Sequence, residues 1–305
     1  MSKQTKRLQL LNNCVKQIEN LPWITQEGES IQIKNVFICP ICLKAIELSK
    51  IKEDKLNDVI SLEDVPPKSI GGKPNLITCK KCNNSCGHDI DVYLQNELKY
   101  IEDLKSKKDK KAKVSSEEIS LNATFSLNDD NSIALIIKKE NNPNNVQAYF
   151  DHIKKSWANT TINVQISLSD VKRNKESANI ALLKSAYLLA FKKLGYIYIL
   201  NSNLSVVREQ ILNPNDKILS SFIVGDESYI PDTYSNGVYR AFFNKMEILM
   251  VIFSFKLGNA TEMCRRAIAL PPINTETDIY EVISKSKEYT ISIIEEIQDS
   301  GMYSL

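Results

Sequence analysis

Two pairs of cysteines are the residues of this chain whose spacing most directly specifies chemistry. Cys39 and Cys42 form one CxxC pair, and Cys79 and Cys82 form a second. Each pair lets one tight turn supply two thiolates, and four thiolates are the ligand set of closed, tetrahedral structural zinc. We therefore predict a structural Zn²⁺ site at these four cysteines.

The segment between the two pairs is longer than the linker of a zinc ribbon, which is about 15 to 20 residues. A sizeable insert must therefore lie between the two turns, and further chemistry is expected there. No thioredoxin-like βαβ pattern surrounds either pair, which argues against a redox role. Cys86 lies one helical turn beyond Cys82 and is interpreted as a spare thiol.

Length and composition exclude several classes of protein. The chain has 305 residues, of which 43% are hydrophobic, so it can bury about two ordinary cores and is not disordered throughout. Its formal charge of +2 is too small to indicate nucleic acid by itself. There is no secretory leader pattern, and no segment reaches the roughly 18 apolar residues needed to span a bilayer. We expect a cytoplasmic protein with no membrane partner.

The elements that must position the cysteines can be read from apolar spacing. Residues 5–20 have the pattern of a helix, and residues 31–38 that of a strand leading into Cys39. Residues 58–62 predict a second strand, leading into Glu63 and Asp64. Prolines and glycines make residues 66–74 an irregular loop, and a helix is expected from Lys80, with a break near Gly87.

The rest of the chain predicts a second domain. Six lysines fall within residues 105–113 and form either a solvated linker or a phosphate-contacting patch. We place a zinc-bound domain at 1–104, a basic linker at 105–118 and a second domain at 119–305. Strands are expected at 119–127, 132–139, 160–169, 196–200 and 246–255, with a helix at 174–194. The expected fold class is therefore α+β.

One stretch of the sequence resembles a known family. CPIC at 39–42, followed by SLEDVPPKSIGGKPNLITCKKCNNSCGHDID, resembles the zinc-stapled HNH endonucleases, in which a ββα-metal fold lies between two CxxC turns. The resemblance covers about residues 36–95. It rests on an acidic residue closing a strand, a Pro-Lys-Ser-Ile-Gly-Gly loop, an Asn-Leu pair and CxxCN. It implies a treble-clef-like ββα-metal module at the N-terminus.

The resemblance also implies roles for individual residues. It implies Glu63 and Asn83 as ligands of one divalent ion and Asn75 as the residue that braces the loop. Asp64 stands where the family usually has the histidine that activates water, and aspartate is a weaker base than histidine at pH 7. Three interpretations remain open. Asp64 acts as the base or as an extra metal ligand, His88 supplies the base, or the module binds without cutting.

The chemistry of such a site needs few residues. An ion held by oxygen donors stabilises the charge on a scissile phosphate while a base activates water. Glu63, Asp64 and Asn83 are oxygen donors and would suit Mg²⁺ or Mn²⁺. Four lysines around the same loop either contact phosphates or are ordinary solvated side chains: Lys68, Lys73, Lys80 and Lys81.

These expectations define two candidate functions. The first is a metal-dependent HNH-type DNA endonuclease, a phosphodiester hydrolase, in a setting such as restriction or antiphage defence. The alternative is a catalytically altered HNH-like zinc module that binds nucleic acid or a protein partner without cutting. The C-terminal domain is expected to select substrate, a protein partner or a homo-oligomer.

Overall fold

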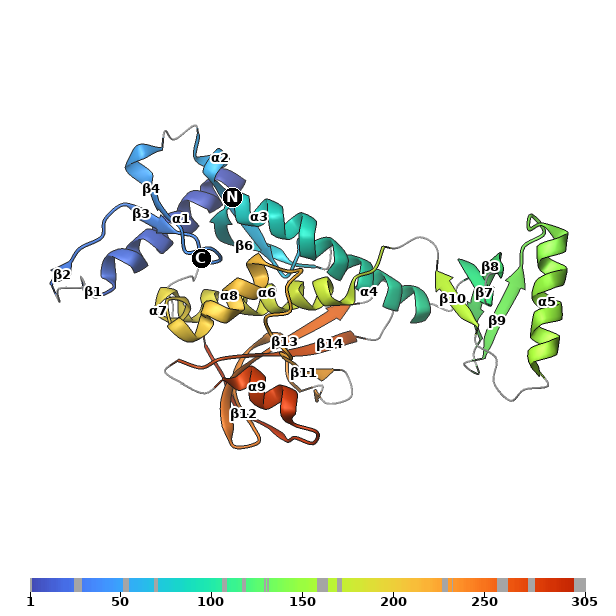
Figure 1. Ribbon diagram of the computed structural model, residues 1–305. Coiled ribbons are helices and arrows are strands. Elements are labelled where there is room, and N and C mark those ends of the chain that lie inside the picture. The colour runs from blue at the N-terminus through green and yellow to red at the C-terminus, as the bar shows by residue number, and fades with distance from the viewer. Residues whose placement is uncertain are drawn as a thin grey trace. The chain divides into compact units, whose positions relative to one another are not determined.

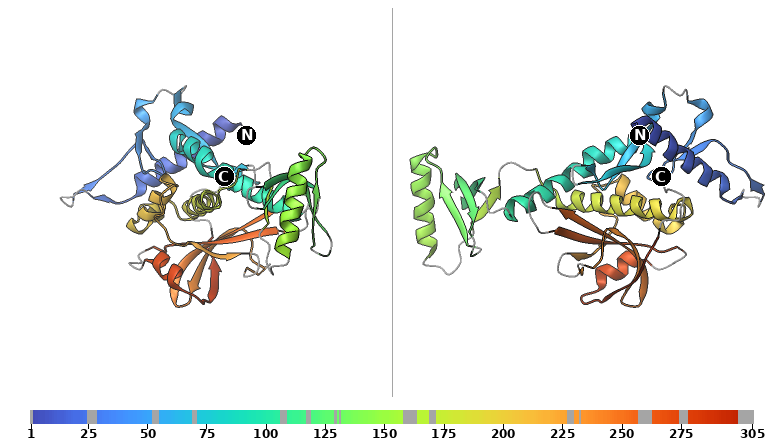
Figure 2. Two further views of the ribbon diagram at one scale, coloured as in Figure 1. Left: turned by 45° about the vertical axis from the view of Figure 1, so that its right-hand side comes forward. Right: turned by 180° about the vertical axis from the view of Figure 1, so that it is seen from behind.

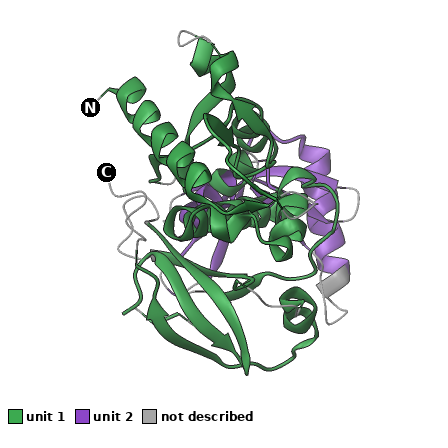
Figure 3. Ribbon diagram, turned by 90° about the vertical axis from the view of Figure 1, so that its left-hand side faces the viewer, with its two compact units in different colours: residues 1–95, 174–256, 261–305 green, residues 96–173, 257–260 purple. Residues whose placement is uncertain are grey.

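The computed structural model divides the chain into two compact units (Figure 3). Unit 1 comprises residues 1–95, 174–256 and 261–305, and unit 2 comprises residues 96–173 and 257–260. The structure describes residues 2–24, 29–51, 55–68, 71–105, 109–116, 119–128, 130, 132–157, 164–168, 172–226, 230–231, 233–256, 263–273 and 278–298.

This division differs from the predicted one. The segment expected to be a linker, 105–118, contains a strand, β7 (Lys110–Ser116), in which Ala112 and Val114 are buried and Lys113 between them is exposed; residues 106–108 and 117–118 lie outside the described residues. Residues 174–256 and 261–305 belong with the cysteine-rich region and not to a separate domain. The physical reason is that the N-terminal segment is too small to bury its apolar side chains alone, and it packs them against the helix at residues 175–194.

The N-terminal part of unit 1 begins with α1 (Lys3–Asn20), as the apolar spacing predicts. The Ser2 side chain caps the helix by accepting a hydrogen bond from the Thr5 amide. One face, including Leu10 and Ile18, is buried. The short elements that follow are β1 (Trp23–Ile24) and β2 (Ser30–Ile31), which pair with each other, β3 (Val36–Ile38) and β4 (Ala45–Glu47), which also pair, a 3₁₀ turn (Leu48–Lys50) and α2 (Leu56–Val59).

A hairpin followed by a helix comes next. Strands β5 (Ile60–Val65) and β6 (Lys73–Cys79) are antiparallel, and α3 (Lys80–Cys86) begins directly after β6. A π-helical turn, η4 (Gly87–Asp91), then leads into α4 (Val92–Lys105). This turn lies at the position where the sequence predicts a break near Gly87. The local order is thus strand, strand, helix.

The long helix α6 (Lys175–Leu194) is the core element of unit 1 (Figure 1). Asn174 caps its start, and Gly195, at φ +73°, ends it. Thirteen of its residues are buried, because it packs against both the β5–β6 region and a five-stranded sheet. Residues 196–200 were predicted to be a strand, but α7 (Tyr196–Ile199) is helical. Short apolar runs fit a buried helix as well as a strand, so periodicity cannot decide between them.

The five-stranded sheet closes unit 1. Its order is β11-β14-β13-β12-β15, and every neighbouring pair is antiparallel. The predicted strand at 246–255 is the central strand, β13, which pairs with a strand on each edge, contacts α6, and has its residues 248–253 buried. The bounds are β11 (Ile223–Asp226), β12 (Gly237–Phe243), β13 (Met246–Lys256), β14 (Met263–Leu270) and β15 (Ile291–Glu296), with η5 (Ser202–Leu204), α8 (Ser205–Leu212) and α9 (Ile279–Lys285) beside them.

Unit 2 is a smaller α+β unit with its own core (Figure 2). Its antiparallel sheet has the order β10-β7-β8-β9, with β8 (Ile119–Leu127), β9 (Ile133–Ile137) and β10 (Gln165–Leu168) near the predicted positions. Helix α5 (Pro143–Trp157), which carries His152, packs on the sheet through Tyr149. Both units therefore mix helix and sheet, and the predicted α+β class is confirmed.

Candidate metal centre and the adjacent charge cluster

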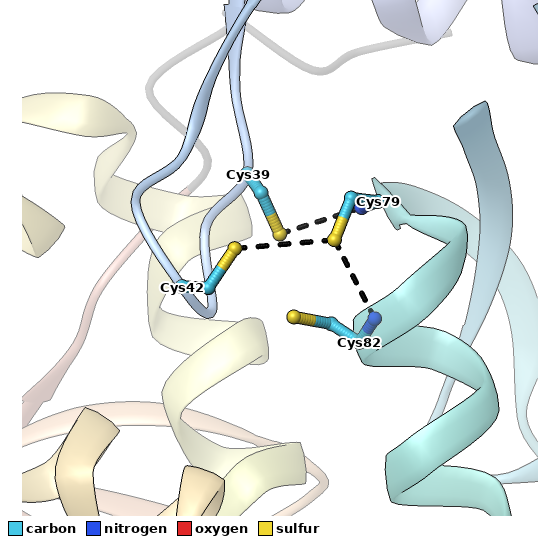
Figure 4. Close-up of side chains that lie close together, drawn as sticks. All are labelled: Cys39, Cys42, Cys79 and Cys82. Carbon is cyan, nitrogen blue, oxygen red and sulfur yellow. Dashed lines mark hydrogen bonds between the residues drawn. The ribbon is translucent and has the colours of Figure 1, made fainter.

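The four predicted cysteines come together at one point (Figure 4). Cys39 follows β3 and Cys42 lies in the turn before β4, while Cys79 ends β6 and Cys82 lies in the first turn of α3. Their sulfur atoms all lie within 4.8 Å of one another. The Cys79 amide donates to the Cys39 Sγ at 3.3 Å, and the Cys82 amide donates to the Cys79 Sγ at 3.4 Å. The predicted clustering of these four side chains is confirmed.

This cluster has the chemistry of a metal site. Cys39, Cys79 and Cys82 are buried and Cys42 is half-buried. Four thiolates that close together repel one another unless a cation lies between them, so the cluster can hold a metal ion such as zinc. Over the described ranges, no other group of three or more His, Cys, Asp or Glu ligand atoms lies as close together.

Cys86 remains outside this group. The thiol is 4% exposed, and burial raises its pKa to about 12, so it stays protonated at neutral pH. Its Sγ atom does not belong to the group of four sulfur atoms that lie within 4.8 Å of one another. The side chain therefore behaves as a small buried apolar group, in keeping with its interpretation as a spare thiol.

Glu63, which the resemblance implies as a metal ligand, lies inside the protein. Its side chain is on β5 and only 3% of the residue is exposed. The Lys184 Nζ donates to Glu63 Oε1 at 2.8 Å, and the Thr78 Oγ1 donates to Glu63 Oε2 at 3.3 Å. Both carboxylate oxygens therefore already accept hydrogen bonds within the core.

Lys184 also binds a second carboxylate. Its Nζ donates to Asp91 Oδ2 at 2.6 Å, so one ammonium from α6 joins β5 to the π-helical turn. Burial raises the pKa of Glu63 and of Asp91, because a single ammonium only partly offsets the cost of placing two carboxylates in the interior. Burial alone would lower the pKa of Lys184, but the two carboxylates raise it above its usual value and keep the ammonium charged.

Asp64 lies in a different environment from its neighbour. The pairing register of β5 with β6 shifts between Glu63 and Asp64, and Asp64 is half-buried. Its Oδ1 atom is buried and accepts no hydrogen bond from the described residues. Burial raises the pKa of Asp64, and the nearby charges of Lys68 and Lys3 oppose that shift.

The two asparagines of the motif also have distinct surroundings. The Asn83 Nδ2 donates to the Leu62 carbonyl at 2.7 Å and to the Ser61 Oγ at 3.1 Å, which ties α3 to β5. Asn75 is half-buried on β6, and its Oδ1 atom has no partner among the described residues. Asn83 is therefore placed as a brace between strand and helix.

The divalent ion implied by the resemblance does not fit this arrangement. It would need Glu63, Asp64 and Asn83 to present oxygens to one point. The oxygens of Glu63 are instead engaged by Lys184 and Thr78, whereas the Asn83 hydrogen bonds to β5 are donated by its Nδ2 atom and do not use its Oδ1 atom. In this structure Glu63 is therefore held as the ion-pair partner of Lys184 and not as a ligand of the implied Mg²⁺ or Mn²⁺.

His88 is on the surface. Its side chain is 90% exposed, and its Nδ1 atom lies 2.8 Å from the Asp89 Oδ1. It sits in the π-helical turn, and its recorded partner is the next residue and not Asp64. This position gives no support to His88 as the base.

The loop lysines have the exposure that phosphate contacts need. Lys68, Lys73 and Lys81 are exposed, whereas Lys80 is half-buried and lies 3.5 Å from Asp58. The sequence prediction missed Lys3 and Lys6, whose charges act on Asp64 from the start of α1. It also missed Lys184 and Asp91. A lysine within the apolar run 178–191 was the available signal for Lys184.

Comparison with family models, curated proteins and solved structures finds no match to this chain. None of the helices within the described part of the chain is both long enough and apolar enough to cross a membrane.

Proposed function

We propose that residues 36–95 form a zinc-stapled module of the HNH type that binds nucleic acid through its phosphates. The observation that carries this proposal is the clustering of lysines around the β5–β6 loop. The charges of Lys68, Lys3 and Lys6 act on Asp64, while the other carboxylate of the motif, Glu63, is paired with Lys184 inside the protein. The charges that act on Asp64 at this loop are therefore those of lysines, which are the side chains that a phosphate contact requires.

The local architecture supports the same proposal. The β5–β6 hairpin and α3 follow one another without interruption, and the cysteine cluster fixes the end of β6 and the start of α3. Helix α1 packs on β3 and β6, and Arg7 donates a hydrogen bond to Asn57 just before β5. This packing carries the lysines at the start of α1 to the same side of the module as the hairpin loop.

Binding without cutting is favoured by two changes in the motif. Asp64 replaces the usual histidine, and Glu63 is engaged by Lys184. The first change weakens the base at neutral pH, and the second removes a ligand from the implied ion. Neither change affects the cysteine cluster. The module therefore keeps its four cysteines but lacks a histidine base and a free Glu63 carboxylate, the groups that hydrolysis uses.

An endonuclease is the second candidate, and one observation favours it. Asp64 has a raised pKa and a buried Oδ1 atom without a described partner. A carboxylate whose pKa moves toward neutrality becomes a better general base. In this candidate function Asp64 takes the proton from water, and DNA is the substrate.

The binding proposal is tested by fluorescence anisotropy with labelled duplex DNA, single-stranded DNA and RNA at several salt concentrations. We expect Lys68→Glu/Lys73→Glu to weaken binding at least ten-fold and to reduce the slope of log affinity against log salt by about 2, since each lost phosphate contact removes about 0.9 of slope on duplex DNA. Lys245→Glu/Lys287→Glu, at two exposed lysines on another part of unit 1, changes the net charge by the same amount and is the matched control. Absence of binding by the wild type, or equal loss in the control, would contradict the proposal.

The second candidate is tested by plasmid nicking with Mg²⁺ or Mn²⁺. The binding proposal predicts no cleavage by the wild type. Cleavage that Asp64→Ala reduces about 10²-fold or more would instead assign the endonuclease function. Asp64→His shows whether restoring imidazole restores activity.

A further inference from the structure

Lys184 is a buried lysine that contacts two buried carboxylates. The residue lies midway along α6 and its side chain is 1% exposed, so its ammonium cannot reach solvent. Glu63 comes from β5 and Asp91 from the π-helical turn, and their side chains are 4% and 16% exposed. Three segments that are distant in sequence therefore deliver one cation and two anions to one enclosed point.

The contacts of the ammonium resemble those of a bound cation. Its Nζ lies 2.8 Å from Glu63 Oε1 and 2.6 Å from Asp91 Oδ2. Thr78, fully buried, supplies a hydroxyl to the other oxygen of Glu63. The two carboxylates that face the ammonium are hard oxygen donors of the kind that Mg²⁺ and Mn²⁺ use, and Thr78 holds Glu63 in place from its other oxygen.

The charge balance shows that the ammonium does not fully satisfy these donors. Two carboxylates and one ammonium sum to a charge of −1 when all are ionised. Asp91 Oδ1 is buried and has no hydrogen-bond partner among the described residues. A divalent cation at this point would balance the charge, which identifies Lys184 as the group that keeps such an ion out.

We infer that Lys184 is a tethered counter-cation that occupies a latent divalent-metal site formed by Glu63 and Asp91. The side chain binds the carboxylates permanently, because it is covalently part of the helix and has no exposed route away from them. In the wild type the ammonium therefore excludes an exchangeable metal ion from the point between Glu63 and Asp91. This inference does not depend on nucleic-acid binding, so it stands or falls separately from the proposed function.

The test is Mn²⁺ binding to zinc-loaded protein, measured by electron paramagnetic resonance. The wild type should not bind Mn²⁺ at Glu63, so its Mn²⁺ signal should be the same as that of Glu63→Gln. Lys184→Ala opens the space and should gain one Mn²⁺ site per chain, at least ten-fold tighter than any site of the wild type. The double variant Lys184→Ala/Glu63→Gln should lack the new Mn²⁺ site. Lys184→Arg, which retains a cation, should also lack it.

A Glu63-dependent Mn²⁺ site in the wild type would overturn the inference, as would a folded Lys184→Ala protein that gains no site. If Lys184→Ala unfolds in the absence of metal, its thermal unfolding midpoint with and without Mn²⁺ decides the question. A rise that requires Glu63 supports the inference, and no rise contradicts it.

Discussion

The cysteine cluster and the Glu63–Lys184–Asp91 cluster both involve the β5–β6 hairpin, but they are assembled in different ways. The cysteines come as two local pairs, each supplied by one turn. The charge cluster joins residues separated by 121 and 93 positions along the chain. The first cluster is visible as a spacing, whereas the second exists only when α6 packs against the hairpin (Figure 1). A motif within one segment can therefore predict that the four cysteines lie together and still miss the partner of a nearby residue such as Glu63.

The two clusters also differ in what their loss should cost. Zinc binding to a thiolate site is coupled to folding and contributes on the order of 10 kcal/mol or more. A buried ion pair contributes little net free energy, but removing one partner leaves an uncompensated charge and costs about 3 to 5 kcal/mol. Variants of the two clusters can therefore be ranked before measurement.

Cys79→Ser should have the largest effect. If the cluster holds zinc as proposed, the variant loses the ion, and unit 1 loses protection against hydrogen exchange while β7 and β8 of unit 2 keep theirs. Metal analysis and hydrogen exchange measure these outcomes. Cys86→Ala is the control, since it removes a buried thiol outside the cluster and should retain one zinc per chain. A fully protected, zinc-free Cys79→Ser protein would contradict the staple role.

Lys184→Met should have the next largest effect. It leaves Glu63 and Asp91 buried without their cation, so we expect the free energy of unfolding to fall by about 3 to 5 kcal/mol with no change in zinc content. Urea denaturation of zinc-loaded protein measures the change. Lys192→Met, on the same helix, should cost less than about 1 kcal/mol. Equal losses in the two variants would mean that the ion pairs of Lys184 are unimportant.

The pH dependence of stability gives a smaller effect with a defined sign. The pKa values of Glu63 and Asp91 are raised in the folded state, so the folded protein binds more protons than the unfolded chain above about pH 4. Their contribution to the free energy of unfolding is therefore present at low pH and is lost as pH rises through the folded pKa values. The slope is at most about 1.4 kcal/mol per pH unit for each proton. Glu63→Gln should flatten this part of the curve, and an unchanged curve would rule out Glu63 as its source.

Thr78→Val should have the smallest effect. The change keeps the shape of the buried side chain but removes the hydroxyl that donates to Glu63 Oε2 at 3.3 Å. We expect a loss of about 0.5 to 1.5 kcal/mol in urea denaturation, the usual net value of one hydrogen bond. In a Glu63→Gln background the loss should change, because the two residues share this contact. Strict additivity would show that the hydroxyl does not act through Glu63.

Local patterns of residues were sufficient to predict the cysteine cluster and several helices and strands. Two CxxC pairs identified the cysteine cluster, and apolar periodicity located α1, α6 and the central strand β13. These succeed because a turn, a helical face or a buried strand is encoded within a few neighbouring residues. The predicted identity of the bound ion as zinc rests on the same local signal.

The remaining features depend on contacts between segments that are distant in the sequence. Residues 174–256 and 261–305 belong to the same unit as the N-terminal region. Residues 196–199 are helical, and Lys184 forms an ion pair with Glu63. Each of these outcomes depends on which distant surface a segment packs against. The charge state and partners of a buried carboxylate follow from that packing, because removal from water makes its nearest cation decisive. A single segment carries no record of a cation supplied from 121 residues away.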